Sequence, residues 1–252
     1  MIQLIDLCKR FGDLIAVDSI NLKVNPGEVF GFLGPNGAGK TTTIKMMAGL
    51  IKPTSGRVFI DGWDLTEHPN QAKKVIGFIP DRPFIYEKLT ALEFLRFIAG
   101  LYNLSKNGVE GEIDHFFRIF GLTDWQDELI ESFSHGMKQR LVMASAFIHQ
   151  PKLIIVDEPM VGLDPRGASL VKEIFRGFCD KGGTIFMSTH TLEIAEEVCD
   201  RIAIIQEGKI IAVGNMKELK ERAGSDGKKL ESIFFKLTSG GEVKRVVEAL
   251  KI

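Results

Sequence analysis

Eight consecutive residues of this sequence have the types and spacing of a phosphate-binding loop. They are Gly34, Pro35, Asn36, Gly37, Ala38, Gly39, Lys40 and Thr41. The segment fits the pattern G-x-x-x-x-G-K-[ST] at every fixed position, and its glycines allow successive backbone N–H groups to converge on phosphate oxygens. The ammonium of Lys40 can then reach the β- and γ-phosphates, and the hydroxyl of Thr41 can hold Mg²⁺. The segment predicts a site for a nucleoside triphosphate and its metal ion.

The residues on either side of this segment supply the context that such a loop requires. Residues 29–33 are short, apolar and bounded by turn-forming residues, which predicts a buried parallel strand. Residues 42–49 have helical spacing of apolar side chains, with Gly49 as the predicted end of the helix. The positive end of the helix dipole would face the same anion. We therefore include Thr42 with the loop in the predicted nucleotide site.

Two acidic side chains follow a second apolar strand. Residues 153–156 predict the strand, and Asp157 and Glu158 come directly after it. Nucleotide sites in open α/β sheets form at the carboxyl ends of strands. There Asp157 could bind Mg²⁺, which prefers oxygen ligands, and Glu158 could polarise an attacking water. The alternative is a pair that only caps a helix near Pro159, but the phosphate loop elsewhere in the chain favours the catalytic interpretation.

A third strand is predicted to end at the same edge of the sheet. Residues 184–187 predict this strand, and Ser188, Thr189 and His190 follow them. His190 could therefore reach the γ-phosphate. A single loop histidine is more often structural, so this interpretation depends on the two neighbouring motifs.

The order of the predicted elements indicates an α/β fold with two additional parts. Apolar stretches separated by turns within residues 1–30 and 56–62 predict an antiparallel β subdomain beside a P-loop NTPase core with a parallel sheet. From about residue 88 to residue 150 the pattern becomes helical, which predicts an α-helical subdomain inserted into that core. We expect one domain over residues 1–215 and a charged C-terminal tail over residues 216–252.

Composition narrows the classes of function. The chain has 252 residues, of which 44% are hydrophobic, and a formal net charge of −1, so nucleic acid is not an expected partner. Its cysteines are scattered, which fits structural thiols in a reducing cytosol. They are Cys8, Cys179 and Cys199. The sequence contains no signal peptide and no apolar run near the roughly 20 residues of a membrane helix. We expect a protein that is soluble, or held at a membrane only through a partner.

Together these motifs resemble the ATP-binding subunit of an ABC transporter, over roughly residues 1–215. In that family ATP lies between two subunits, and the phosphate loop of one faces the signature segment LSGGQ of the other. Residues 133–137 resemble this signature, and Ser134 and Gly136 match it. The positions that differ are Phe133, His135 and Met137. The resemblance implies that Ser134 and Gly136 bind a γ-phosphate at a helix N-terminus.

Four further positions take their roles from the same resemblance. Asp164 lies in residues 161–165, which resemble the dimer-contact loop, and His190 matches the switch histidine. Phe11 matches the aromatic residue that stacks on adenine, although an aromatic side chain at this position could also belong to the core. Asp81 stands where the family usually has a glutamine that senses Mg²⁺ and the attacking water, and its carboxylate could still ligate Mg²⁺.

The resemblance also implies the function of the whole protein. It implies an ATPase that uses ATP and Mg²⁺ and forms a homodimer, or a heterodimer with a paralogous subunit. The ATPase would act on a separate integral membrane permease, from the cytoplasmic face of the cell membrane. Residues 229–238 resemble the tail of a subfamily of ABC-2 or multidrug-export type. The run from residue 217 to 222 is interpreted as a solvated helix face.

Two other functions remain open at this point. A soluble ABC-type ATPase could act on nucleic acid or ribosomes, but such proteins tend to carry two cassettes or long coiled coils, and this chain has one phosphate loop. The altered signature and Asp81 could instead indicate a nucleotide-gated module without catalysis. A GTPase or a protein kinase is disfavoured because the sequence lacks their guanine-binding and catalytic-loop motifs.

Overall fold

The computed structural model describes residues 1–82 and 84–222. The strands are β1 (Ile2–Phe11), β2 (Leu14–Val24), β3 (Val29–Leu33), β4 (Ser55–Ile60), β5 (Trp63–Asp64), β6 (Ile76–Ile79), β7 (Leu153–Asp157), β8 (Thr184–Thr189), β9 (Arg201–Gln206) and β10 (Lys209–Gly214). The helices are α1 (Lys40–Met47), α2 (Pro69–Lys74), α3 (Ala91–Leu101), α4 (Lys106–Ile119), α5 (His135–Phe147), α6 (Pro165–Asp180), α7 (Leu192–Val198) and α8 (Met216–Arg222). Two short 3₁₀ helices, Thr123–Trp125 and Ile130–Ser132, lie between α4 and α5.

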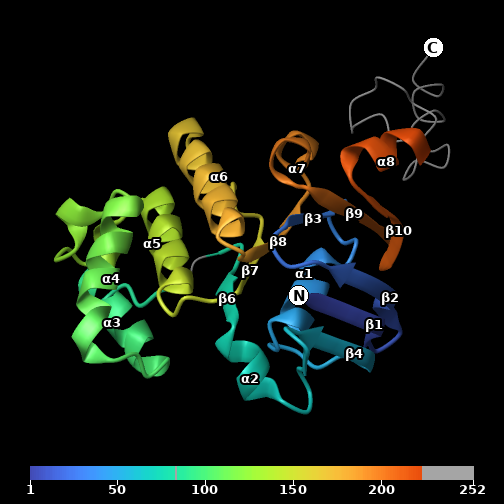
Figure 1. The fold of residues 1–252 in the computed structure, drawn as a ribbon, viewed down its shortest axis with the longest axis horizontal. Helices are drawn as coiled ribbons and strands as arrows, with labels where there is room; N and C mark the ends of the chain where they lie inside the picture. Colours follow the sequence, from blue (N-terminus) through green and yellow to red (C-terminus); the bar gives the residue numbers. More distant parts are fainter. Residues whose placement is uncertain (83, 223–252) are drawn as a thin grey trace.

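The strands form two sheets (Figure 1). The larger sheet has the order β10-β9-β3-β8-β7-β6, in which the strands from β9 to β6 run parallel and β10 joins as a hairpin partner of β9. The smaller sheet, β2-β1-β4-β5, is antiparallel. The expected P-loop NTPase α/β fold with an antiparallel β layer is confirmed.

The central strands of the larger sheet are buried on both faces, as their continuous apolar sequences predict. In β3 every residue is buried. Phe30 and Phe32 pack into the cluster that β1, β2, β4 and α1 share, whereas Val29 and Leu33 pack into the cluster that contains α3, α4, α5 and α6. This alternation follows from the period of two along a strand. The larger sheet therefore separates two hydrophobic cores.

Helices α3, α4 and α5 follow β6 in the chain and precede β7, and Figure 1 shows them together at one end of the molecule. Helix α3 begins with a capping box, because the Thr90 side chain accepts from the backbone N–H of Glu93 and the Glu93 side chain accepts from that of Thr90. Helix α8 covers the expected helical run at residues 217–222. The tail segment at residues 229–238 lies outside the described residues.

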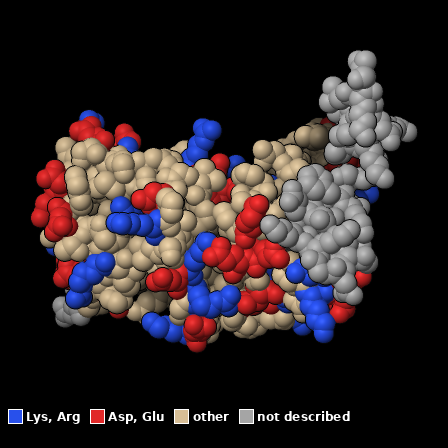
Figure 2. Space-filling view, turned by 90° about the horizontal axis from the view of Figure 1, so that it is seen from above, with Lys and Arg blue, Asp and Glu red and all other residues tan. Residues whose placement is uncertain are grey.

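Charged side chains are interspersed on the molecular surface. On the face that Figure 2 shows, Lys and Arg side chains alternate with Asp and Glu side chains among the described residues, and wide uncharged areas separate them.

Candidate nucleotide-binding site

The segment between β3 and α1 forms an open loop at the N-terminus of a helix. Gly37 and Gly39 have φ angles of 79° and 103°, a region that favours glycine. Gly39 is the N-cap of α1, and among the described residues no side chain caps this helix. The helix begins at Lys40, two residues before the predicted start. The first-turn N–H groups of α1 are therefore free to bind an anion, as the sequence pattern predicts.

The ammonium of Lys40 lies inside the curl of this loop. Nζ donates to the carbonyl oxygens of Gly34 at 2.7 Å and Pro35 at 3.2 Å, and it lies 3.9 Å from Oε1 of Glu158. Burial lowers the pKa of Lys40 from its ordinary value, and the carboxylates of Glu158 and Asp157 oppose that shift. A buried cation with neutral carbonyl partners is suited to a phosphate, which would offset its cost of desolvation.

Strand register brings the acidic pair and the histidine to the same edge of the sheet. Asp157 pairs with Ser188 across β7 and β8, and the hydroxyl of Ser188 donates to Oδ1 of Asp157. Nδ1 of His190 lies 2.8 Å from Oε1 of Glu158. The backbone of Glu158 has a φ of 52°, which is uncommon for a residue with a side chain, and its N–H donates to the Ser188 carbonyl at 3.3 Å. The two carboxylates therefore differ: Asp157 is buried and fixed, whereas Glu158 faces the loop.

One cavity of about 630 Å³ contains most of the predicted nucleotide site. The predicted residues that line it are Phe11, Asn36, Gly37, Gly39, Lys40, Thr41, Thr42, Asp81, Asp157, Glu158 and His190. Gly34, Pro35 and Ala38 belong to the same loop. The ring of Phe11 is half exposed at this cavity, and Nζ of Lys9 lies 5.1 Å from its centroid. The residues predicted to contact the adenine base, the metal ion and the phosphates thus lie around one space large enough for a nucleotide.

The residues around this cavity fit a magnesium–nucleotide complex. Thr41, Asp157 and Asp81 line it with oxygen atoms, the donors that Mg²⁺ prefers. Across the described ranges, no three His, Cys, Asp or Glu side chains form a group that could hold a metal alone. Mg²⁺ commonly keeps only one or two protein carboxylates and completes its shell with phosphates and water. The donor set therefore fits a metal that arrives with the nucleotide.

Five residues that line the cavity were not predicted from the sequence. They are Leu14, Ile15, Ala16, Glu207 and Gly208. The start of β2 and the β9–β10 turn supply them, and the N–H of Asp18 donates to the carbonyl of Gly208 at 2.9 Å. A Cβ placed at Gly39 would lie 2.5 Å from the Ala16 carbonyl oxygen, so the two backbones nearly touch. The turn at residues 207–208 was the only feature of the sequence that pointed to this side of the cavity.

Ser134, Gly136 and Asp164 lie in a second cavity, of about 580 Å³, and not beside the phosphate loop. Ser134 caps α5 by accepting from the N–H of Met137 at 3.3 Å, and Asp164 caps α6 by accepting from the N–H of Gly167 at 2.7 Å. Within one chain these residues are therefore separate from the other predicted ligands.

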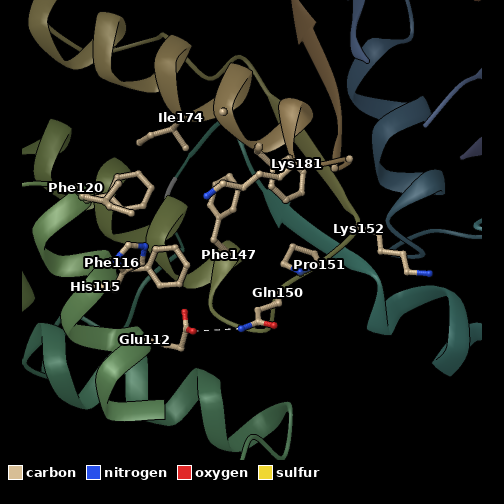
Figure 3. Close-up of a pocket in the computed structure, with 15 residues that line it drawn as sticks. Glu112, His115, Phe116, Phe120, Phe147, Gln150, Pro151, Lys152, Ile174 and Lys181 are labelled. Atoms are coloured by element: carbon tan, nitrogen blue, oxygen red, sulfur yellow. Dashed lines mark hydrogen bonds between the residues drawn. The ribbon is translucent and has the colours of Figure 1, made fainter. Parts of the chain in front are cut away.

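A third cavity, of about 590 Å³, lies between α4, the end of α5 and α6 (Figure 3). Figure 3 shows Phe116, Phe120 and Phe147 around it, with ring centroids 6.3 to 6.4 Å apart. At its edge the amide of Gln150 donates to Glu112 at 3.3 Å. None of the predicted nucleotide-site residues among those described lines this cavity, and its aromatic walls distinguish it from the nucleotide site.

The described part of the chain contains no helix that is both long enough and apolar enough to cross a bilayer.

Comparison with known proteins identifies the family. The family model described as "ABC transporter" matches residues 17–161. The linearmycin resistance ATP-binding protein LnrL of Bacillus subtilis is 37% identical over 226 residues, which cover 90% of this chain and 73% of LnrL. The bacitracin transport ATP-binding protein BcrA of Bacillus licheniformis is 40% identical over 88% of this chain and 72% of BcrA. The probable multidrug ABC transporter ATP-binding protein YbhF of Escherichia coli is 38% identical, and this chain spans 39% of its length.

Solved structures agree with these relatives. A structure described as an ATP-binding subunit of an ABC transporter superposes with a TM-score of 0.90 at 33% identity, over 95% of this chain and all of that one. The cbiO1 protein of Clostridium perfringens, part of the ABC transporter complex cbiONQ, superposes with a TM-score of 0.78 at 26% identity, over 100% of this chain and 98% of cbiO1. The family match and the cbiO1 match both include the phosphate loop, Asp157 and Glu158. The chain belongs to the ABC transporter family, among its ATP-binding proteins.

Proposed function

We propose that this chain is the ATP-hydrolysing subunit of an ABC transporter. It couples Mg-ATP binding, dimer closure and hydrolysis to transport through a separate membrane permease. One observation carries the proposal: Lys40, Asp157, Glu158 and His190 line a single cavity together with an uncapped helix N-terminus. Electrostatic stabilisation, a metal ligand and a general base are the parts that phosphoryl transfer to water requires.

The first step is capture of the triphosphate. The free N–H groups of the loop and of α1 bind phosphate oxygens, and Nζ of Lys40 exchanges the carbonyls of Gly34 and Pro35 for the β- and γ-phosphates. Phe11 offers a half-exposed ring on which adenine can stack. Mg²⁺, when bound, neutralises phosphate charge, and Thr41, Asp157 and Asp81 would hold it.

The second step is activation of water. Glu158 is the proposed general base, because its carboxylate lies beside Lys40 and lines the same cavity as the phosphate loop. Nδ1 of His190, 2.8 Å away, orients this carboxylate, and its ring can reach the γ-phosphate. Asp157 is held by the Ser188 hydroxyl and is thereby kept for the metal instead of the water.

The third step requires a second subunit. Ser134, Gly136 and Asp164 line a cavity away from the chain's own phosphate loop. We propose that a second copy, or a paralogous ATPase subunit, brings its nucleotide to Ser134 and Gly136. Loss of the bridging phosphate after hydrolysis would then let the two subunits separate.

The permease contact is proposed to lie on the helical subdomain, next to Asp81. Phe84 and Tyr86 follow Asp81 in the chain and are 84% and 60% exposed. The ring of Tyr86 packs edge-on against Phe97 of α3 at 5.4 Å, and Leu101 lies one helical turn further along α3 and is 63% exposed. A group of large exposed apolar side chains marks a partner surface. Movement of Asp81 with the nucleotide could be transmitted there directly.

This proposal includes the predicted architecture and place of the protein. Residues 1–215 form the ATPase domain, residues from about 88 to 150 form its helical subdomain, and residues 216–252 form a tail. The subunit works in the cytoplasm, at the inner face of the cell membrane, through its permease. Relatives named for bacitracin transport and linearmycin resistance support export of the ABC-2 or multidrug type. They also support transport over an action on nucleic acid or ribosomes.

Two measurements test the function. The tagged chain, expressed in its own cells, should copurify with a multi-span membrane protein, and the complex should release phosphate from ATP in the presence of Mg²⁺. Retention on DNA or RNA at physiological salt, without a membrane partner, would support the nucleic-acid alternative. Nucleotide binding by a complex that never releases phosphate would instead identify the non-catalytic module.

A further inference from the structure

The side chain of His135 packs against the loop between β7 and α6. His135 is the first residue of α5, and Gly162 lies in the loop between β7 and α6. A Cβ placed at Gly162 would lie 2.7 Å from Nε2 of His135 and closer still to Cδ2. The imidazole therefore occupies the space that any side chain at position 162 would need. Gly162 also has a φ of 79°, which favours glycine independently.

The loop that His135 contacts begins at the proposed general base. Two tight turns connect Glu158 to Gly162: the N–H of Val161 donates to the Glu158 carbonyl at 3.2 Å, and the N–H of Leu163 donates to the Met160 carbonyl at 3.3 Å. Beyond them Asp164 caps α6. Only a short, hydrogen-bonded segment therefore separates Gly162 from the backbone of Glu158, so a displacement of Gly162 would also shift Glu158.

The other side of the contact is the segment proposed to meet the second nucleotide. Ser134 precedes His135 and caps α5, and Gly136 follows it. A Cβ placed at Gly136 would lie 3.7 Å from the Gly162 carbonyl oxygen, so the first turn of α5 lies close to the loop along its backbone as well. At the position of His135 the related signature has glycine, which has no side chain that could make this contact.

We propose that His135 is a positioning residue that couples the two nucleotide sites of the dimer. Its ring fixes the distance between the signature helix and the loop that starts at Glu158. A phosphate bound at Ser134 thereby acts on the general base of the same chain, which serves the other nucleotide. This inference rests on the proposed function and deepens it.

A double-mutant cycle tests the contact without nucleotide. The four proteins are the wild type, His135→Gly, Gly162→Ala and the double variant, and each is unfolded in urea. The new methyl group in Gly162→Ala meets the imidazole, so this variant should have the lowest unfolding midpoint. Removing the ring should relieve the overlap, and the double variant should unfold at a higher urea concentration than Gly162→Ala.

Gly182→Ala is the matched control for backbone strain. Gly182 has a φ of 90°, and the described residues leave the space around its missing Cβ open. The alanine there carries the same left-handed strain without the overlap. Adding His135→Gly to Gly182→Ala should therefore restore nothing. Additive effects in the Gly162 cycle would show that the ring does not occupy this space, and they would overturn the inference.

Turnover by the permease complex tests the positioning role. Gly162→Ala should lower kcat about tenfold to a hundredfold, as a small displacement of a catalytic group does, and leave KM and the calorimetric affinity for ATP unchanged. The double variant should recover most of kcat. His135→Gly alone should reduce the cooperativity of hydrolysis with ATP concentration, and His135→Gln, whose planar amide can fill the place of the ring, should preserve it.

The outcomes separate the inference from the proposed function. The two substitutions could be coupled in the unfolding cycle and yet change neither kcat nor cooperativity. That result would show a merely structural contact and overturn the positioning role. A wild-type complex that never hydrolyses ATP would refute the proposed function and the role together, while the unfolding cycle would still decide the contact. Normal hydrolysis by the wild type with additive unfolding effects would refute the inference alone.

Discussion

The N-terminus of α1, which follows the phosphate loop, and the N-terminus of α5, in the signature segment, differ in how their backbone N–H groups are capped. Helix α1 has Gly39 as its N-cap, in a left-handed conformation without a side-chain cap among the described residues, and its first residue, Lys40, is buried. Helix α5 has Ser134 as its N-cap, and the Ser134 hydroxyl already accepts from the N–H of Met137. The first-turn N–H groups of α1 are free to bind a phosphate in the isolated chain. At α5, one of the corresponding N–H groups already donates to the Ser134 hydroxyl.

The difference indicates which site can act alone. A serine hydroxyl can accept from a backbone N–H and donate its own hydrogen at the same time, so Ser134 can keep its cap and still bind a phosphate. The neighbouring helix α6 is capped by the carboxylate of Asp164, which would repel an anion. Of the two helix N-termini in the second cavity, only that of α5 suits a phosphate. We therefore expect binding to depend on the loop and closure to depend on the signature.

Lys40→Ala should have the largest effect. The variant removes the only buried lysine among the described residues, and both nucleotide affinity and turnover should fall, turnover by about 10²–10³-fold. Calorimetry with Mg-ATP and phosphate release measure the two losses. Lys45→Ala is the control, because Lys45 is exposed on the same helix and should change neither. Unchanged affinity in Lys40→Ala would mean that the loop is not the phosphate site.

Glu158→Gln should separate binding from hydrolysis. The amide keeps the shape of the side chain but cannot accept a proton, so turnover should fall by about 10²–10⁴-fold while ATP binding persists. ATP-dependent dimers should therefore accumulate in size-exclusion chromatography. Glu207→Gln controls for charge, because Glu207 lines the same cavity on an exposed turn. Hydrolysis at the wild-type rate in Glu158→Gln would refute its role as general base.

These two residues also show why part of the site was predictable from the sequence. The loop of residues 34–41 and the pair Asp157–Glu158 are contiguous motifs at strand ends, and parallel register is enough to bring them together. The fold class followed from the same alternation of strands and helices. The cavity wall at Ala16 and Gly208 could not be predicted, because only the packing of β2 against the β9–β10 turn places it there.

The contact between His135 and Gly162 could not be predicted from the sequence for the same reason. The two residues are 27 positions apart in the sequence, and no sequence pattern links one to the other. The signature and the loop were each recognisable as motifs, but their distance is a property of how α5 packs beside α6. Local patterns were therefore enough to propose the residues of each site, whereas the contact between the sites depends on tertiary packing.

Phe11→Ala should weaken the affinity for ATP moderately. Stacking of a base on an aromatic ring contributes about 1–3 kcal/mol, and the half-exposed ring of Phe11 has little packing to lose. Calorimetry should show a weaker affinity for ATP and almost no change for inorganic triphosphate, which has no base. Phe11→Tyr should bind as the wild type does. Equal losses for ATP and triphosphate would place the adenine elsewhere and limit the first site to phosphate recognition.

Ser134→Ala should have the smallest effect on the isolated chain and a selective effect on the dimer. Loss of the N-cap should lower the free energy of unfolding by about 0.5–2 kcal/mol, and affinity for the first ATP should not change, because the phosphate loop is in another cavity. In the Glu158→Gln background, however, ATP-dependent dimers should become weaker, since the donor to the second phosphate is missing. Ser134→Thr should preserve both properties.

Ser132→Ala is the control for Ser134→Ala, because its hydroxyl donates to the Leu129 carbonyl outside the second cavity. If Ser134→Ala lowers stability but leaves the ATP-dependent dimers intact, Ser134 acts only as a helix cap. The signature site would then bind phosphate through the backbone of α5 alone, and the two helix N-termini would be more alike than their caps suggest.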